Sequence, residues 1–583
     1  MLHTLTRSLR ENKGPALVTV LLSALEVVFE IVIPLFMSNL IDFGIEGGSM
    51  AAVWKFGAFL LLLAAFQLAT GVLAARIAAR ASVGFAANLR EDMYDNVQTF
   101  AFSNIDKFST ASIVTRLTTD TTNVQNAFQM LMRMAIRAPV MLIFSMIVSF
   151  RISRDMSMTF LIILPILALA LFFIIRSVFP VFSRVFRTYD ELNNVVQENV
   201  RGIRVVKSFN QERHEIGKFG AISARIYKDF SKGERLITLN APLMQFCIYT
   251  CMIVISWLGA KAIIASGNDP ALGLTTGNLT ALITYTMQIL SSLMMLSMVF
   301  AMLTISLSSA RRIAEVLEER SDIPQPEQPV MTVRDGAVDF DHVSFVYASK
   351  ADKKVLDDID LHIRSGETIG IIGGTGASKS SLVQLIPRLY DVTGGKLTLG
   401  GVDVRDYDLD TLRGAVAMVL QKNELFSGTI AENLRWGNEN ATDEQLRHAC
   451  KLACADEFIS AMPDGYDTHI EQGGTNVSGG QKQRLCIARA LLKKPKVLIL
   501  DDSTSAVDTR TDAQIQQALS TYIPDTTKII IAQRISSVQN ADRIVVLDDG
   551  RIDAVGCHDE LLRTCEIYRE VYESQQKGGE DDA

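Results

Sequence analysis

The sequence predicts a two-part protein, in which a helical domain with six membrane spans precedes an α/β domain that lies outside the membrane. Two observations support this division. Apolar residues make up 48% of the 583 residues, and they are concentrated in long blocks within the first 320. The remaining sequence alternates short apolar strands with helical stretches, as α/β domains do.

These shifts in composition give the expected domain boundaries. We assign residues 1–320 to the membrane domain, 321–332 to a charged and proline-rich linker, 333–575 to the α/β domain and 576–583 to an acidic tail. A polar end of this kind is expected to be disordered. The net charge of −7 gives no reason to expect a nucleic acid as partner.

Six apolar blocks are each close to the roughly 20 residues that a helix needs to cross a bilayer. The blocks are residues 16–41, 56–75, 134–150, 156–179, 241–264 and 279–303. Six spans place both termini on one side, and the long basic segments after spans two and four indicate that this side is the cytosol. Arg151 and Arg154, in the turn after span three, are an exception to the charge pattern. We therefore expect a multi-pass protein of the inner or plasma membrane with both termini in the cytosol.

Two kinds of segment are expected on the cytosolic side. Residues Leu2–Lys13 carry basic residues among apolar ones, which predicts a short helix along the membrane surface, and Gly14-Pro15 is expected to end it. The two long segments between spans are expected to be helical and to turn near residues 104–111 and 209–215. Such turning points are where a moving cytosolic domain can push on the membrane helices.

Two carboxylates interrupt the first span. Glu26 and Glu30 are one helical turn apart on the same face. A carboxylate inside a membrane is costly, and it is usually paired or turned towards water. Two interpretations stay open: a polar wall of a cavity for a small-molecule substrate, suited to cationic compounds, or a structural pair with a basic residue elsewhere.

The second domain is organised around a glycine-rich turn between an apolar strand, Thr368–Ile372, and a helical stretch, Leu382–Tyr390. The turn and the residues that follow it are Gly373, Gly374, Thr375, Gly376, Ala377, Ser378, Lys379, Ser380 and Ser381. Backbone N–H groups at such a helix start bind phosphate, while Lys379 would reach the β- and γ-phosphates of ATP and the Ser380 hydroxyl would hold Mg²⁺. Ser378 stands where the pattern has glycine, and its Cβ crowds the loop if the backbone needs a positive φ.

Three further stretches fit a nucleotide-binding domain. Val497–Asp501 reads as a buried parallel strand that ends in a carboxylate, which places Asp501 near the Mg²⁺. Asn476–Gln481 precedes a helix, and its two glycines allow the backbone to approach a phosphate closely. Tyr347 follows a strand and can stack on an adenine ring, although packing is the more common role of such an aromatic residue.

These motifs, in this order, resemble the ABC transporter family over nearly the whole chain, and six spans followed by one nucleotide domain is similar to a half-transporter of the exporter type. The resemblance implies an A-loop at Tyr347, a Q-loop at Gln421 that contacts Mg²⁺, and a D-loop from Ser503 to Asp508. It implies a signature motif made of Ser478, Gly479, Gly480 and Gln481. It also implies two nucleotide domains that close head to tail, with each ATP between one chain's Walker motifs and the other chain's signature.

Two positions depart from the family's pattern. Asp502 stands where hydrolytic sites of the family carry a glutamate that polarises the attacking water. A base that is one methylene shorter is displaced from its water, and a displacement near 1 Å costs about 100-fold in rate. Gln533 stands in place of the family's switch histidine, and it forms hydrogen bonds but cannot become charged. We interpret the two changes together as a degenerate catalytic site.

The function expected from these observations is a subunit of an ATP-driven exporter that moves drugs or other amphipathic compounds out of the cytosol. Its expected partner is a different half-transporter that supplies the missing glutamate and histidine, in a heterodimer similar to bacterial multidrug exporters. Two alternatives stay open. One is a regulatory, ATP-gated membrane protein that does not pump, and the other is a homodimeric lipid or peptide exporter that uses Asp502 as a poor base.

Overall fold

The structure is a computed structural model that divides the chain into two compact units. It describes residues 1–269, 273–347, 354–503 and 506–580. The first unit comprises Met1–Gln98 and Thr110–Glu319, and the second comprises Thr99–Ser109 and Arg320–Ala583. The last three residues of the predicted acidic tail lie outside the described residues.

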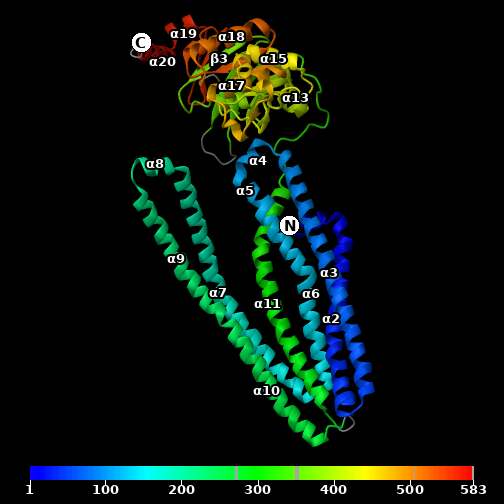
Figure 1. The fold of residues 1–583 in the computed structure, drawn as a ribbon. Coiled ribbons are helices and arrows are strands. Elements are labelled where there is room, and N and C mark those ends of the chain that lie inside the picture. Colours follow the sequence, from blue (N-terminus) through cyan, green and yellow to red (C-terminus); the bar gives the residue numbers. More distant parts are fainter. Residues whose placement is uncertain (270–272, 348–353, 504–505, 581–583) are drawn as a thin grey trace. The chain divides into compact units, whose positions relative to one another are not determined.

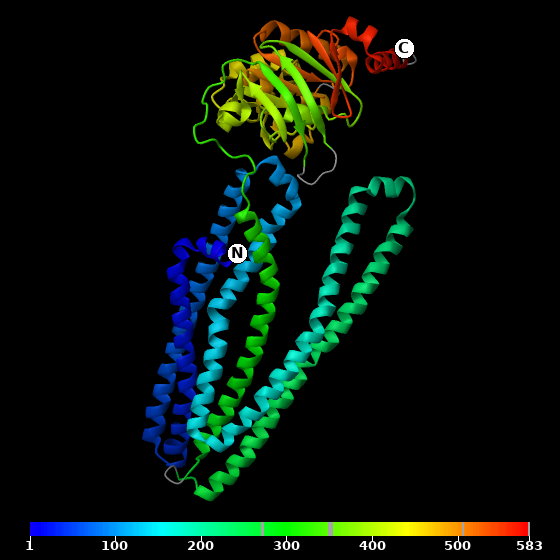
Figure 2. The same cartoon turned by 180° about the vertical axis from the view of Figure 1, so that it is seen from behind.

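The first unit is helical (Figures 1 and 2). Its elements are α1 (Leu2–Arg7), η1 (Arg10–Asn12), α2 (Lys13–Asn39), η2 (Leu40–Glu46), α3 (Met50–Gln98), α5 (Thr110–Thr115), η3 (Arg116–Asp120), α6 (Thr121–Ile152), α7 (Arg154–Arg201), α8 (Ile203–Ser208), α9 (Glu212–Thr238), α10 (Asn240–Ser266) and α11 (Thr276–Glu318). Helices α2, α3, α6 and α11 pack together as a bundle. Helices α7 and α9 form a long hairpin closed by α8, and α10 continues from α9 to pack on α7 and α11.

Six helical segments among the described residues are long and apolar enough to cross a membrane, which confirms the six predicted spans. A helix suits this environment because it satisfies its own backbone N–H and C=O groups where no water is present. The spanning helices also continue well past their apolar parts: α3 runs for 49 residues and α7 for 48.

The start of the chain differs from the prediction. Gly14 and Pro15 do not end the first helix; they lie in the first turn of α2. Proline is tolerated there because the first N–H groups of a helix have no intrahelical partner. The break lies at Arg10 instead, whose φ is 39°. Its guanidinium pairs with Glu91, at 2.8 Å, and with Asp92, both on α3.

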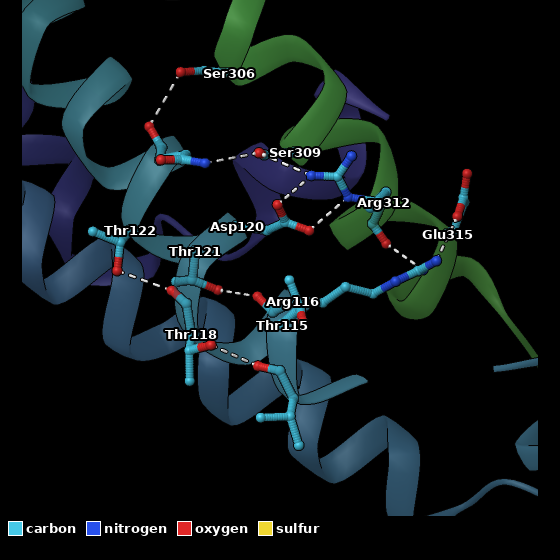
Figure 3. Close-up of polar contacts among 12 residues, drawn as sticks. Thr115, Arg116, Thr118, Asp120, Thr121, Thr122, Ser306, Ser309, Arg312 and Glu315 are labelled. Carbon is cyan, nitrogen blue, oxygen red and sulfur yellow. Dashed lines mark hydrogen bonds and ion pairs between the residues drawn. The ribbon is translucent and has the colours of Figure 1, made fainter. Parts of the chain in front are cut away.

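A cluster of buried polar residues joins η3 and α6 to α11 (Figure 3). The Asp120 carboxylate is 1% exposed and accepts two hydrogen bonds from the Arg312 guanidinium, one of them 2.7 Å long from Nε. Arg116 donates to the Arg312 carbonyl at 2.7 Å and pairs with Glu315 at 3.0 Å. The π-helical turn η3 is therefore fastened to α11 at both of its ends. Such turns are uncommon and occur often at functional positions.

Replacing Asp120 by asparagine should destabilise the first unit. The change removes the charge that faces Arg312 and turns one of the two acceptors into a donor. We expect the free energy of unfolding to fall by about 1–3 kcal/mol, measured as a lower midpoint of thermal denaturation in detergent. Lys218→Gln breaks an exposed pair with Glu198 and is the matched control, which should leave the midpoint unchanged. Equal shifts in the two variants would contradict the role given to this cluster.

The second unit is built on β-sheets covered by helices. Its strands are β1 (Val338–Phe345), β2 (Leu356–Ile363), β3 (Thr368–Gly373), β4 (Gly394–Leu399), β5 (Val402–Asp403), β6 (Val416–Val419), β7 (Gly428–Thr429), β8 (His469–Ile470), β9 (Val497–Asp501), β10 (Thr527–Ile531), β11 (Arg543–Asp548) and β12 (Arg551–Gly556). Its helices are α4 (Phe102–Lys107), α12 (Lys379–Gln384), α13 (Leu409–Ala415), α14 (Ile430–Arg435), α15 (Asp443–Leu452), α16 (Asp456–Ser460), α17 (Gly479–Leu492), α18 (Thr509–Tyr522), α19 (His558–Thr564) and α20 (Glu566–Glu580). Short 3-10 turns are η4 (Val404–Asp406), η5 (Gly465–Asp467), η6 (Gln472–Gly474) and η7 (Ile535–Ser537).

The larger sheet determines where functional residues can gather. Its strand order is β12-β11-β3-β10-β9-β6, and a second sheet has the order β2-β1-β4-β5. Strands β11, β3, β10, β9 and β6 are parallel, and Ile531 of β10 lies opposite both Ile371 of β3 and Asp501 of β9. Because the carboxyl ends of parallel strands meet at one edge, the residues that follow these strands come together there.

One segment of the expected membrane domain belongs to the second unit. Residues 99–109, which contain α4, group with the nucleotide domain rather than with the helices on either side of them. The Tyr390 hydroxyl donates to the Asp106 carboxylate at 2.8 Å, and the rings of Tyr390 and Phe102 are 6.0 Å apart. The first predicted turning point is thus attached to the nucleotide domain.

Candidate functional site

The residues predicted to hold a nucleotide gather at the carboxyl edge of the larger sheet. The glycine-rich loop follows β3, Asp501 closes β9, and Gln421 and Gln533 lie just beyond β6 and β10. Residues 373–381 line a cavity of about 520 Å³ together with Gln421, Asp501, Asp502, Ile531 and Gln533. The structure therefore brings the predicted loop, carboxylates and glutamines into one place.

The loop ends in a residue with left-handed backbone geometry. Ser378 has φ 68° and ψ 23°, and it precedes α12 directly. For a residue with a Cβ this conformation costs about 1–2 kcal/mol, which is why glycine is usual here. The helix that follows is shorter than expected, since α12 ends at Gln384 and not at Tyr390.

The Lys379 ammonium lies over the loop. Its Nζ donates to the carbonyls of Gly373 and Gly374, at 2.9 Å each. Burial lowers the pKa of Lys379, and the charges of Asp501 and Asp502 act in the opposite direction. The Lys379 side chain thus lies at the entrance of the loop, where phosphate oxygens would bind.

Oxygen atoms suited to Mg²⁺ meet beside the loop. The Ser380 hydroxyl donates to the Asp501 carboxylate at 3.0 Å, and Gln421 lines the same cavity. Burial raises the pKa of Asp501, and the hydrogen bond from Ser380 opposes this shift. Within the described ranges, no cluster of three or more His, Cys, Asp or Glu residues could hold a metal. A hydroxyl and a carboxylate fit Mg²⁺, which takes further oxygens from bound phosphates.

The Asp502 carboxylate is enclosed by two side-chain amides. Its Oδ2 accepts a hydrogen bond of 2.7 Å from Gln533 Nε2 and one of 3.3 Å from Gln421 Nε2. Asp502 is 7% exposed, and burial raises its pKa while the two amides lower it. Its backbone has φ 48°, a region that a residue with a side chain rarely adopts.

A residue near the C-terminus holds the segment that carries Gln533. Gln575 of α20 donates to the Gln533 carbonyl at 2.7 Å and accepts from the backbone N–H of Ile535 at 2.9 Å. Sequence reasoning missed this contact because no local pattern connects α20 to the end of β10. Gln575 thereby fixes the backbone of Gln533, from which the Gln533 side chain extends to Asp502.

Tyr347 lies next to the loop but does not line the cavity. Its hydroxyl is 2.7 Å from the Ser381 hydroxyl, and its ring stands perpendicular to that of Tyr390 at 5.1 Å. Phe345 packs on it at 4.8 Å. The packing role is thus present, while 45% of Tyr347 stays exposed and accessible to an adenine ring.

The signature residues lie away from the cavity of their own chain. Ser478 caps α17: its hydroxyl accepts from the Gln481 N–H at 3.2 Å, and the Gln481 side chain accepts from the Ser478 N–H at 2.9 Å. Ser478 and Gly479 are exposed. The structure does not bring this helix start to the phosphate loop, so any nucleotide that it contacts comes from elsewhere.

The predicted D-loop is described in part, since Thr504 and Ser505 lie outside the described residues. The Ala506 N–H donates to Gln483 of α17 at 3.1 Å. The Asp508 carboxylate caps α18 by accepting from the Thr511 N–H at 2.9 Å, and backbone hydrogen bonds lower its pKa.

Glu26 and Glu30 meet a basic partner in the first unit. Arg137 of α6 donates to both carboxylates, at 2.7 Å each. Gly71 of α3 allows Glu26 to lie close, because a Cβ there would be 3.3 Å from the Glu26 carboxylate. Glu30 and Arg137 also line a cavity of about 170 Å³ with several residues of α11, among them Met287. The structure therefore contains features of both interpretations: a structural pair and a polar cavity wall.

Substitution of Ser378 tests whether the backbone conformation of the loop affects ATP binding. A β-branched side chain cannot adopt the left-handed backbone without strain, so we expect Ser378→Val to weaken ATP binding by about tenfold or more. Ser378→Gly relieves the strain and should bind ATP at least as tightly as the natural chain. Titration calorimetry with purified chain measures both. Equal affinity of the valine variant would contradict the importance given to this φ angle.

Comparison with known proteins matches two parts of the chain to two family models. Residues 16–294 match the family model of the ABC transporter transmembrane region, and residues 356–505 match that of the ABC transporter. An uncharacterised ABC transporter ATP-binding protein of Bacillus subtilis, YfiB, is 35% identical over 558 residues, which is 96% of each chain. An uncharacterised ABC transporter ATP-binding protein of Mycobacterium tuberculosis is 33% identical over 580 residues, covering 99% of this chain and 98% of that protein.

A solved structure shares the fold. It is the structure of a bacterial Atm1-family ABC exporter with ATP bound, which superposes with a TM-score of 0.82 over 97% of this chain and 99% of that chain. The sequence identity is 24%, so the likeness concerns the fold.

Proposed function

The chain belongs to the ABC transporter family, and from that premise we propose that it is one subunit of a heterodimeric, ATP-driven exporter. Its own site binds ATP and Mg²⁺ and hydrolyses the nucleotide slowly, while its signature motif completes the competent site of a different half-transporter. The observation that carries this proposal is that the Asp502 carboxylate already accepts hydrogen bonds from two side-chain amides.

A catalytic base must be within hydrogen-bond reach of the water that it activates. Asp502 is one methylene shorter than glutamate, and its Oδ2 already accepts from Gln533 and Gln421. Gln533 stands where the family has a histidine, so the two departures from the family pattern form a single hydrogen bond of 2.7 Å. The two altered positions are therefore in direct contact, which is a physical reason to treat them as one unit.

The groups needed for binding ATP are present in spite of this. Ser380 and Asp501 would hold Mg²⁺, which neutralises phosphate charge when bound. Lys379 would exchange the carbonyls of Gly373 and Gly374 for phosphate oxygens. Binding without rapid hydrolysis is the behaviour that this set of residues supports.

The signature supports a second subunit. The start of α17 is exposed and lies away from the cavity of its own chain, so a nucleotide that contacts Ser478 and Gly479 belongs to a partner. ATP is a cytosolic metabolite, and this supports a cytosolic location for the nucleotide-binding unit.

The substrate that suits the cavity of the first unit is an amphipathic cation. Glu26, Glu30 and Arg137 together have a formal net charge of −1, and Glu30 and Arg137 line the cavity. Met287 and Met295 on its wall are polarisable side chains that adapt to varied apolar surfaces. This combination fits compounds that join one positive charge to an apolar body, a class that includes many drugs.

Restoring the family's residues tests the degenerate site. The double change Asp502→Glu and Gln533→His should raise ATP turnover at this site by about tenfold or more, because base and water regain their contact. The measurement is ATP hydrolysis by the complex with the partner's own glutamate disabled. Each single change should give much less than the double change, since each leaves half of the existing pair. Unaltered turnover in the double variant would remove the main support for the proposal.

The subunit composition distinguishes the remaining alternatives. The intact mass of the complex, extracted gently from its native membrane, should show an equimolar second half-transporter. A homodimer that hydrolyses ATP would show that Asp502 is a sufficient base. A heterodimer that hydrolyses ATP without net transport into vesicles would favour a regulatory protein that gates but does not pump.

Neutralising Glu30 tests the substrate class. Glu30→Gln removes a charge from the cavity wall and leaves the pair of Glu26 and Arg137 intact. We expect the KM for a cationic amphiphile to rise by about fivefold to tenfold, with little change for an uncharged analogue of the same size. Glu234→Gln, an exposed change on α9, is the control that should affect neither compound. An equal effect of Glu30→Gln on both compounds would contradict the cation assignment.

A further inference from the structure

We infer that Gln575 is a positioning residue for the nucleotide site. Its side-chain amide holds the segment after β10 so that Gln533 stays hydrogen-bonded to Asp502, and releasing this segment raises ATP turnover at the site. The inference rests on the proposed function and deepens it, because it names a contact that keeps the site slow. Gln575 lies on α20, 42 residues after Gln533 and outside every motif of the nucleotide site.

Local structure does not fix the place of Gln533. Strand β10 ends at Ile531, which lies opposite Asp501 in the sheet. Residues 532–534 belong to no helix or strand, and the next element, η7, begins at Ile535. Gln533 is exposed, so burial does not fix the direction of its side chain either. Its position therefore depends on contacts from other elements.

The Gln575 amide supplies such a contact by bridging the residues on either side of Arg534. Its Nε2 donates to the Gln533 carbonyl at 2.7 Å, and its Oε1 accepts from the Ile535 N–H at 2.9 Å. A group that donates to one residue and accepts from the second residue after it reproduces the spacing with which a neighbouring parallel strand binds. Two hydrogen bonds from one planar amide thus fix both the place and the orientation of this backbone.

Both sides of the contact are anchored independently of it. Tyr568 of α20 is fully buried, and Gln575 follows two helical turns later on the same face. Helix α20 packs on β3 and on η7. Within η7, Ile535 is 1% exposed, and the Ser537 hydroxyl donates to the Asp512 carboxylate at 2.5 Å. Loss of the Gln575 amide should therefore free the segment just after β10 and leave α20 and η7 in place.

The effect on the site follows from the hydrogen bond between Gln533 and Asp502. A carboxylate oxygen that accepts from a fixed amide at 2.7 Å is not free to accept a proton from water. When the Gln533 backbone is released, its side chain can leave Oδ2, and a water molecule can take its place. Among the described residues, those that line the nucleotide cavity include Gln533 and not Gln575. Gln575 thus acts through Gln533 and not on ATP itself.

ATP hydrolysis by the complex with the partner's own glutamate disabled tests this role. Gln575→Met keeps the length of the side chain and removes both hydrogen bonds. We expect kcat to rise by about twofold to fivefold, as for the loss of one neutral hydrogen bond, with little change in the KM for ATP. In a Gln533→Ala background the same change should add nothing, because the residue through which Gln575 acts is gone.

Gln576→Met is the matched control. Gln576 is the exposed neighbour of Gln575 on α20, and its amide donates to the Tyr572 hydroxyl of the same helix at 3.0 Å. This change should alter neither kcat nor KM. An equal rise of kcat in the control would show that α20 was disturbed as a whole and would overturn the role of Gln575.

Hydrogen exchange measures the contact directly. In Gln575→Met the Ile535 N–H loses its acceptor, so a peptide that contains Ile535 should exchange several-fold faster than in the natural chain or in Gln576→Met. This comparison needs neither ATP nor a partner, so its result is independent of whether the site is slow and the complex heterodimeric. Unchanged exchange, an unchanged or lower kcat, or an equal rise of kcat in the Gln533→Ala background would each overturn the inference.

Discussion

The parallel register of β3, β10, β9 and β6 is the constraint on which the nucleotide unit depends. These strands are buried on both faces, so their order cannot shift without exposing apolar side chains. Their carboxyl ends therefore meet at a fixed edge, where the chain segments after residues 373, 419, 501 and 531 come together. Residues more than 100 positions apart in the sequence form one cavity for this reason.

Within that cavity, a buried carboxylate needs hydrogen-bond donors, because burying it without them is costly in free energy. Asp502 meets it through Gln533 and Gln421, and Gln575 in turn holds the backbone of Gln533. Neutral amides satisfy the carboxylate without supplying a second titrating group. Both hydrogen bonds end on the same carboxylate oxygen, Oδ2, and this opposes its use as a base. Ser378 and Asp502 both have a positive φ, so two residues of the site have a strained backbone conformation.

In the membrane unit, buried carboxylates are likewise paired with hydrogen-bond donors. Arg137 satisfies two carboxylates from a neighbouring helix, and Arg312 satisfies Asp120 between η3 and α11 (Figure 3). The Arg137 pairs connect α2 to α6 inside the predicted spans, where apolar contacts between helices give little specificity. The Arg312 pair connects η3 to α11 outside those spans.

The sequence by itself determined the parts of this protein that depend on local pattern. Six apolar blocks specify six spans, and the strand–glycine–lysine order around Lys379 specifies the phosphate loop, because each of these properties lies within about 20 consecutive residues. The sequence pointed to Ser378 as a position where glycine is usual, and the structure gives it a φ of 68°. Only the tertiary structure decided which distant groups meet. The partners Arg137 and Gln575 come from other helices.

The break at Arg10 and the attachment of α4 to Tyr390 likewise depend on contacts across the fold. A pairing between distant residues leaves no periodic trace in the sequence, because it is specified by packing and not by neighbours along the chain.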